Sequence, residues 1–291
     1  MTSTPRTTPA SAVSETAEPL ATSMATVTRS ISYLRSVVGP VELATNFSEV
    51  PDEGSFVACD ALVAHPDWLA HIVRATGERL GTSDDMVAAS LFVQSYAYRL
   101  ATLAIASLTT SGILPDSSLS SCAVSFSRGR VTTLAYPTGA YHVVAASSEA
   151  LAETLCRVTQ LDVAHQLLSD QVLDGHLRPL IVALRGEIRV GERLLWGNVA
   201  SSFAVGFRTM EGVLGPWVQI LGNYFVERAP SYLTGMGQYF NLEVDERRGW
   251  FWERTNCCLY DRLPGNVRCQ DCSRTPQGER RDAYRASLTS P

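Results

Sequence analysis

The sequence predicts a predominantly helical α+β protein with one domain and a small antiparallel sheet or hairpin. Three observations support this fold class. Apolar residues recur at helical spacing through most of the chain, one segment near its middle alternates like a β-hairpin, and no strand–helix alternation indicates a doubly wound sheet. With 291 residues, 45% hydrophobic and 18% charged, the chain has the composition of a globular protein with a full core.

The two ends of the chain differ in composition from its body. Residues 1–29 are rich in Ser, Thr, Pro and Ala, so we expect a disordered N-terminal arm. This arm lacks the apolar stretch of a signal peptide. Residues 275–291 are polar, and we expect a C-terminal tail that frays. These boundaries place the domain at residues 30–274.

The first helices are predicted from proline, capping residues and apolar spacing. Pro66 suits the first turn of a helix, and apolar residues follow it at helical spacing. Ser83 is a candidate N-cap for a second helix that runs to about Thr109 and stops before Gly112. That helix contains the apolar stretch LATLAIASL. We interpret it as a buried central helix rather than a membrane span, because Arg99 and several polar residues interrupt it.

The pattern changes between residues 122 and 146. CAVSFS and RVTTLAY, joined by Arg128-Gly129, are typical of a β-hairpin, and YHVVAA is a candidate third strand. Helical spacing then returns, with expected helix starts near Ser148, after Pro179, after Gly191 and at Pro216. Further on, RGWFWERTN is aromatic and extended, and we interpret Trp250, Phe251 and Trp252 as packing residues of a strand rather than as a shield around a cofactor.

The charge balance argues against binding to nucleic acid. The chain has 24 basic and 29 acidic residues, a formal charge of −5, whereas nucleic-acid-binding proteins usually carry a basic excess. Every basic residue is an arginine, so a phosphate-loop lysine or a Schiff-base lysine is excluded. We expect a cytoplasmic protein without a transmembrane segment, either free or loosely associated with the inner face of the membrane.

Four of the seven cysteines lie close together near the C-terminus, in a C-C-x10-C-x2-C array. The array consists of Cys257, Cys258, Cys269 and Cys272. The other three are isolated, and we interpret them as small buried residues: Cys59, Cys122 and Cys156. Four thiolates are a complete ligand set for an iron–sulfur cluster or for a tetrahedral zinc ion. Adjacent cysteines can face one centre only if the backbone turns there, which favours an iron–sulfur cluster and leaves zinc open.

The array, its flanks and one upstream segment resemble a known family. Arg254 precedes Cys257-Cys258-Leu259-Tyr260, and Arg262-Leu263-Pro264 follows; upstream stands Leu195-Trp196-Gly197-Asn198-Val199-Ala200-Ser201. These residues are similar to those of the FhuF-like ferric-siderophore reductases, from about Thr45 to Arg274. The resemblance implies a [2Fe–2S] cluster bound by the four cysteines. It also implies a fold similar to the C-terminal part of aerobactin-type siderophore synthetases, which lack the array.

The resemblance further implies an enzyme of iron uptake, a ferric-siderophore reductase among the oxidoreductases that act on metal ions. One-electron transfer converts chelated Fe(III) to Fe(II), which the oxygen ligands of a siderophore bind more weakly, so iron is released in the cytoplasm. Hydroxamate siderophores are the favoured partners, because tris-catecholates hold Fe(III) harder. The Gly235-Met236-Gly237 segment lacks the third glycine of a nucleotide fingerprint, so an external donor such as a ferredoxin or flavoprotein is expected.

The arginines around the array are weak candidates for substrate binding. Arg254, Arg262 and Arg268 could attract an anionic chelate, although an ordinary solvated face explains them equally well. A second functional reading also stays open. In that reading the chain is a non-catalytic metal protein, either an iron–sulfur sensor of redox state or iron, or a zinc-stabilised binding module.

Overall fold

The computed structural model describes residues 41–42, 54–136, 141–144 and 158–289. The predicted N-terminal arm, Cys156 and the helix expected near Ser148 lie outside these ranges. Within them, the chain is mainly helical with three small sheets, so the predicted fold class is confirmed.

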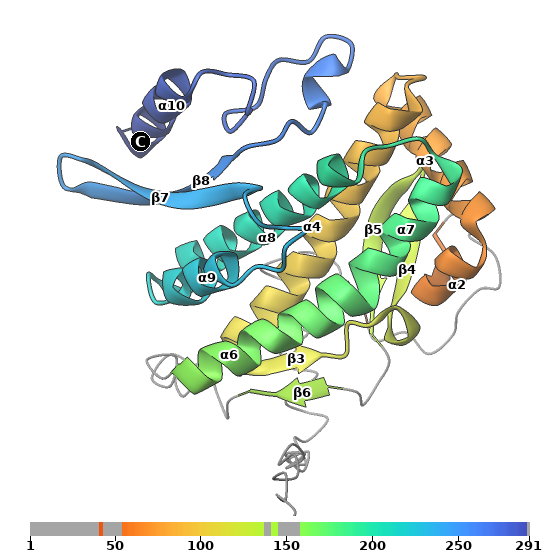
Figure 1. The fold of residues 1–291 in the computed structure, drawn as a ribbon, viewed down its shortest axis with the longest axis horizontal. Coiled ribbons are helices and arrows are strands. Elements are labelled where there is room, and N and C mark those ends of the chain that lie inside the picture. The colour runs from red at the N-terminus through yellow and green to blue at the C-terminus, as the bar shows by residue number, and fades with distance from the viewer. Residues whose placement is uncertain (1–40, 43–53, 137–140, 145–157, 290–291) are drawn as a thin grey trace, which may run out of the picture.

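Two long helices, α4 (Asp85–Ser111) and α8 (Glu192–Leu214), pack side by side at the centre of the molecule (Figure 1). Helix α4 is buried along most of its length, which confirms the predicted central helix. Its N-cap is Asp84, one residue later than expected, because the Asp84 carboxylate accepts hydrogen bonds from two amides of the first turn. Its C-terminus lies before Gly112, which adopts a left-handed conformation at φ 69°.

Shorter helices surround this central pair. They are α2 (Cys59–Ala64), α3 (Pro66–Leu80), α6 (Val158–Leu167), α7 (Arg178–Glu187), α9 (Val218–Glu227) and α10 (Gln277–Thr289), with short 3-10 turns η1 (Leu119–Ser121) and η3 (Tyr260–Arg262). Pro66 occupies the first turn of α3, and α8 begins directly after Gly191, as predicted. Within the described ranges, no helix combines the length and apolar character that crossing a bilayer requires.

Helices α6 and α7 form one continuous rod, because the π-helical stretch η2 (Leu168–Leu177) joins them (Figure 1). The helix predicted at Pro179 is confirmed as α7, although the chain enters it from the π-helical stretch without a break. Proline has no amide hydrogen to donate to the carbonyl four residues earlier, so a normal α-helix loses a bond at this point. Here the chain passes Pro179 directly after a stretch with wider, π-type hydrogen bonding.

The π-helical stretch carries a buried histidine that contacts α4. His176 Nδ1 lies 2.7 Å from the carbonyl oxygen of Ser117 and must donate to it, so Nε2 accepts from the Tyr96 hydroxyl at 2.7 Å. The same hydroxyl lies 3.3 Å from the sulfur of Cys59. Burial lowers the pKa of His176 from 6.5 to about 4, although the hydrogen bond to Ser117 acts in the opposite direction. The imidazole is thus neutral in the native core.

This histidine should make folding stability pH-dependent. Its pKa is lower in the native than in the unfolded state, so its contribution is complete above pH 6.5 and is lost as the pH falls toward 4. We expect the free energy of unfolding to fall by about 1.4 kcal/mol per pH unit in this window. Denaturant titrations at several pH values measure how the free energy of unfolding changes with pH. This pH dependence should be smaller in His176→Gln, whereas His71→Gln, at an exposed position on α3, should have the same pH dependence as the parent. Equal slopes in all three proteins would contradict the assignment.

The main sheet has four strands in the order β1-β5-β4-β2. They are β1 (Val41–Glu42), β2 (Phe56–Ala58), β4 (Ala123–Ser127) and β5 (Arg130–Ala135). β4 and β5 are the predicted hairpin, closed by Arg128 and Gly129 with φ values of 47° and 69°. The candidate third strand exists as β6 (Tyr141–Val143), but it pairs with β3 (Ile113–Pro115) in a separate sheet.

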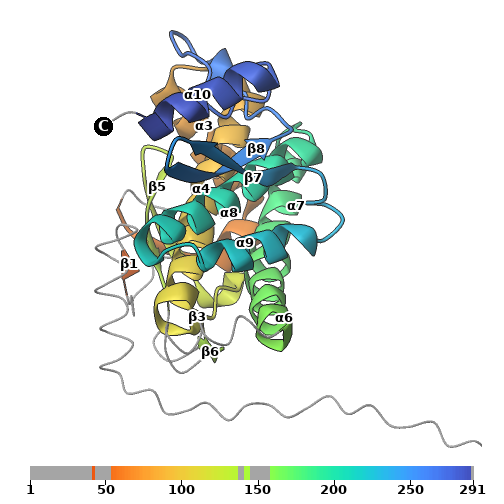
Figure 2. The ribbon, with the colours of Figure 1, turned by 90° about the vertical axis from the view of Figure 1, so that its left-hand side faces the viewer.

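A second hairpin, β7 (Gly237–Val244) and β8 (Arg247–Arg254), lies across α8 near one end of the molecule, and α10 covers it (Figure 2). The Tyr284 hydroxyl of α10 donates to the Trp252 carbonyl at 2.9 Å. Buried Glu253 accepts from Gln277 at 2.7 Å and lies 3.4 Å from the Arg280 guanidinium. The prediction of a fraying tail after residue 274 is therefore wrong, because residues 277–289 form a helix fixed to β8.

Candidate functional site

The cysteine array lies in the segment between β8 and α10. Strand β8 ends at Arg254, and Cys257 and Cys258 follow after two residues. Directly after the pair, Leu259 has a left-handed backbone with φ 66° and begins the turn η3. A bulky residue rarely adopts this conformation, so the surrounding contacts must enforce it. The turn predicted at the adjacent cysteines is confirmed.

The thiols of the array lie near one another. Cys269 donates a hydrogen bond to the Cys258 sulfur, and this bond, helped by the nearby Arg254 guanidinium, lowers the pKa of Cys258. The same bond raises the pKa of Cys269, because it holds the proton there. Burial raises the pKa of Cys257, and the neighbouring thiols of Cys258 and Cys272 act in the same direction. The Leu259 amide partly offsets this effect by donating to the Cys257 sulfur at 3.3 Å.

The four side chains differ in exposure. Cys258 and Cys272 are buried, whereas Cys257 and Cys269 are partly open to solvent. Across the described ranges, no three His, Cys, Asp or Glu side chains form a ready-made site for a single metal ion. A dinuclear cluster needs two pairs of soft ligands instead. Cys257, Cys258, Cys269 and Cys272 together are a donor set of that composition.

A buried chain of hydrogen bonds ties the array to the two central helices. Arg254, only 1% exposed, donates from Nη2 to Asn198 Oδ1 on α8 at 2.8 Å. Asn198 Nδ2 donates to both the backbone oxygen and Oγ of Ser90 on α4, each at 2.8 Å. Ser90 Oγ in turn donates to the Cys258 carbonyl oxygen at 2.8 Å. Three elements therefore fix the position of Cys258.

A glycine on α8 lets the segment before the array approach the helix closely. A Cβ at Gly197 would lie 1.7 Å from the side-chain nitrogen of Asn256. Asn256 uses this nitrogen to donate to the Leu194 carbonyl at 3.3 Å, and its own backbone oxygen accepts from Arg254 Nε at 2.7 Å. Any larger residue at 197 would displace Asn256 from this position.

An apolar contact also holds the segment that carries the array against the helices. Leu259 and Leu263 are buried against Val87 near the start of α4. Partly buried side chains from α3, α4 and α8 surround this contact, and the Cys257 side chain packs against it. The residues that hold the array thus come from segments far apart in the sequence.

The three arginines predicted to bind substrate occupy different environments. Arg254 is buried and out of contact with solvent, so a chelate cannot reach it; the prediction of a substrate contact at Arg254 is corrected to a structural position beside Cys258. Arg262 is half exposed and lies 3.9 Å from the Asp84 carboxylate. Arg268 is exposed and donates to the Arg274 carbonyl at 3.2 Å. Arg262 and Arg268 remain candidates for substrate binding.

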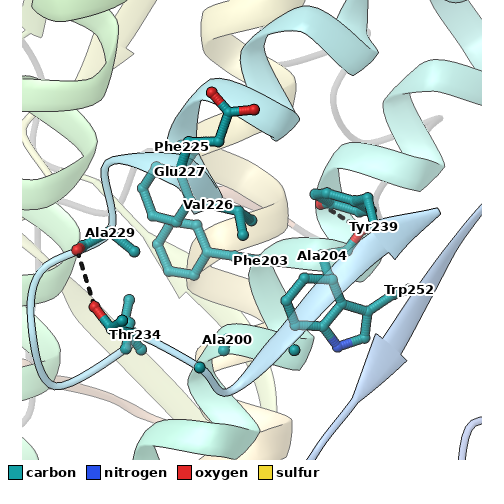
Figure 3. A pocket seen from close by; sticks show the side chains of 13 residues that line it. Ala200, Phe203, Ala204, Phe225, Val226, Glu227, Ala229, Thr234, Tyr239 and Trp252 are labelled. Atoms are coloured by element: carbon teal, nitrogen blue, oxygen red, sulfur yellow. Dashed lines mark hydrogen bonds between the residues drawn. The ribbon is translucent and has the colours of Figure 1, made fainter.

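The aromatic residues of β8 are packing residues, as predicted. Trp250 stacks on Tyr239 with ring centroids 3.8 Å apart, and Trp252 Nε1 donates to Ser201 Oγ on α8 at 3.3 Å. Beside them lies a cavity of about 70 Å³, lined by Phe203, Phe225 and other mainly apolar residues (Figure 3). A cavity of this size holds a few water molecules at most and is too small for a siderophore.

Sequence reasoning found the four thiols but missed the residues that position them. Gly197 and Asn198 stand in the upstream segment quoted for the family resemblance, yet that resemblance assigned them no role. Ser90 carries no recognisable signal, because a serine within a helix usually faces solvent or its own helix. Gly235-Met236-Gly237, which lacks the third glycine of a nucleotide fingerprint, is a turn into β7, with Gly235 at φ 73°.

Comparison with known proteins adds one match. Residues 90–230 match the family model described as ferric iron reductase FhuF-like transporter. The matched segment begins at Ser90 and includes Asn198, whereas the cysteine array lies beyond its end. No curated protein matches the chain.

Proposed function

We propose that this chain, whose residues 90–230 match the FhuF-like ferric iron reductase model, is a ferric-siderophore reductase that holds a [2Fe–2S] cluster on Cys257, Cys258, Cys269 and Cys272. The family itself indicates ferric iron reduction. The observation that carries the cluster is the gathering of four thiols in one segment, which Ser90 and Asn198 of the matched helices anchor. When bound, such a cluster would give one electron to chelated Fe(III), which leaves as Fe(II), and would regain it from an external ferredoxin or flavoprotein.

The residues around the thiols suit this role. Thiolate ligands bring negative charge into a partly buried site, and the Arg254 guanidinium supplies a buried positive charge next to Cys258. Cys257 and Cys269 remain partly exposed, which leaves an edge of the site open to a substrate or donor. Hydroxamate chelates stay the favoured substrates, because Fe(III) held by catecholates can be reduced only by a donor of lower reduction potential. We place the reaction in the cytoplasm.

Analysis of metal and activity tests the proposal directly. Protein purified without oxygen should contain about two irons and two sulfides per chain. After reduction with dithionite and removal of the excess, it should be reoxidised by a ferric hydroxamate while Fe(II) appears in a ferrous trap. One zinc per chain without sulfide would replace the proposal with the zinc-stabilised module. A cluster that reduces no ferric chelate would favour the sensor.

A further inference from the structure

A hollow between the two central helices borders the segment that carries the cysteine array, through Tyr260. Its volume is about 350 Å³, five times that of the cavity beside Trp252, and within the range of small-molecule sites. Residues of α4 and α8 form its walls, Arg130 of β5 lies at one side, and Tyr260 of the array segment lies at another. Leu91 lines the hollow and also packs against the Leu259–Leu263 contact beneath the cysteines. Leu91 therefore lies between the hollow and the segment that carries the array.

Two arginines from different elements meet in this hollow. Arg99 of α4 is half buried, and its Nη1 donates to the backbone oxygen and Oγ of Ser95 at 3.1 and 2.8 Å. Arg130 is exposed at the start of β5. In the part of the chain that the structure describes, neither lies within ion-pair distance of a carboxylate. Burial and the charge of Arg130 together lower the pKa of Arg99, so the two cations repel each other.

The positive charge continues past the hollow. Arg79 Nε donates to the Arg128 carbonyl at 3.2 Å, and these two residues line a neighbouring surface depression with Glu78. The charges of Arg128 and Arg130 lower the pKa of Arg79, after burial as the largest cause. A half-buried guanidinium among like charges is stabilised by an anion that brings oxygen acceptors. The remaining lining, with Gln94, Tyr98 and Tyr260, supplies further hydrogen-bonding groups and aromatic faces.

We infer that this hollow is the binding site for the ferric chelate, and that it selects chelates with a net negative charge from carboxylate groups. The inference rests on the proposed function for the identity of the ligand. Three hydroxamates neutralise Fe(III), so a plain tris-hydroxamate complex offers the arginines no net charge. A chelate with additional carboxylates offers bidentate partners for Arg99 and Arg130. Its iron-binding groups can still be hydroxamates, and it would lie against the segment that carries the cysteines.

Binding can be tested separately from reduction, because Ga(III) complexes match the charge of ferric chelates but accept no electron under these conditions. Calorimetric titration of the anaerobic protein should show binding of gallium citrate, and weaker binding of neutral gallium tris(acetohydroxamate). Arg99→Gln and Arg130→Gln should each weaken citrate-complex binding about tenfold at low salt, and the double variant should abolish it. Arg285→Gln is the matched control, since it removes one charge from α10, which does not line the hollow.

The possible outcomes separate the two proposals. Gallium citrate binding that depends on both arginines, in a protein that reduces no ferric chelate, would support the site and refute the reductase. Reduction that proceeds at the parent rate in the double variant, with unchanged gallium citrate affinity, would overturn the site alone. Equal affinity for the neutral complex, or for citrate without gallium, would also overturn it. If gallium citrate did not bind, and the Arg99→Gln and Arg130→Gln variants reoxidised an acidic donor protein more slowly, the hollow would be assigned to the donor instead.

Discussion

Replacing Cys258 by serine is expected to abolish cluster binding and ferric reduction. A serine oxygen is a hard ligand and replaces a soft thiolate poorly. The substitution also removes the sulfur that accepts the Cys269 hydrogen bond, so a second thiol loses its partner. Cys257→Ser, Cys269→Ser and Cys272→Ser should have similar effects. Iron and sulfide content, the visible spectrum and Fe(II) release in a ferrous trap measure the loss.

The isolated cysteines provide matched controls. Cys59, the first residue of α2, and Cys122, directly before β4, are buried in the core outside the segment that carries the array. Cys59→Ala and Cys122→Ala should therefore retain iron, sulfide and activity, as should Cys156→Ala. If either buried variant lost its cluster while circular dichroism showed an intact fold, the ligand assignment would be wrong. If the Cys258→Ser variant kept its full content of iron and sulfide, the assignment of Cys258 as a ligand would also be wrong.

Replacing Arg254 by methionine should give the second large effect, on both stability and reduction potential. The substitution leaves Asn198 Oδ1 and the Asn256 carbonyl without their donor inside a buried network. Loss of hydrogen bonds from a charged donor in such a place should lower the free energy of unfolding by about 3 kcal/mol. It also removes the positive charge beside Cys258, so the reduction potential of the proposed cluster should fall. Denaturant titration and a spectroscopic redox titration measure the two effects.

Arg254→Lys separates charge from hydrogen bonding. Lysine keeps the positive charge but lacks the planar fork that reaches two acceptors. We expect it to restore most of the potential and only part of the stability. A methionine variant with the parent potential would show that the buried charge does not influence the cluster.

Much of the helical fold could be predicted because its signals are local. Pro66, Gly112 and Gly191 mark helix ends through backbone constraints that need no tertiary contact. The Arg128-Gly129 turn fixes the first hairpin in the same way. At Pro179 the local signal marked the start of α7 but not the π-helical stretch that leads into it without a break.

Helix α10 was missed because its partner is remote. Only Arg280 and Tyr284 are buried on it, and its composition is otherwise that of a fraying tail. The helix is held by buried Glu253 and by the Trp252 carbonyl, both on β8. Nothing within residues 275–291 shows that these partners exist.

The sequence shows the four candidate ligands but not the residues that support them. The spacing of the four cysteines is a property of sixteen consecutive positions, so it is visible in the sequence. The Ser90–Cys258 hydrogen bond joins residues 168 positions apart, and the bond from Asn198 to Ser90 spans 108. Contacts over such separations follow from the packing of α4 against α8.

The anchoring of Cys258 on Ser90 and Asn198 sets an order for biogenesis. During translation the segments that form α4 and α8 leave the ribosome before the array, and domains begin to fold as they emerge. The platform for Cys258 can therefore form while the cysteines are still in the exit tunnel or unmade. Delivery of iron and sulfide to the proposed cluster would then be a late maturation step on a preformed helical body. Helix α10, which follows the array, can dock on β8 only after the thiols have emerged.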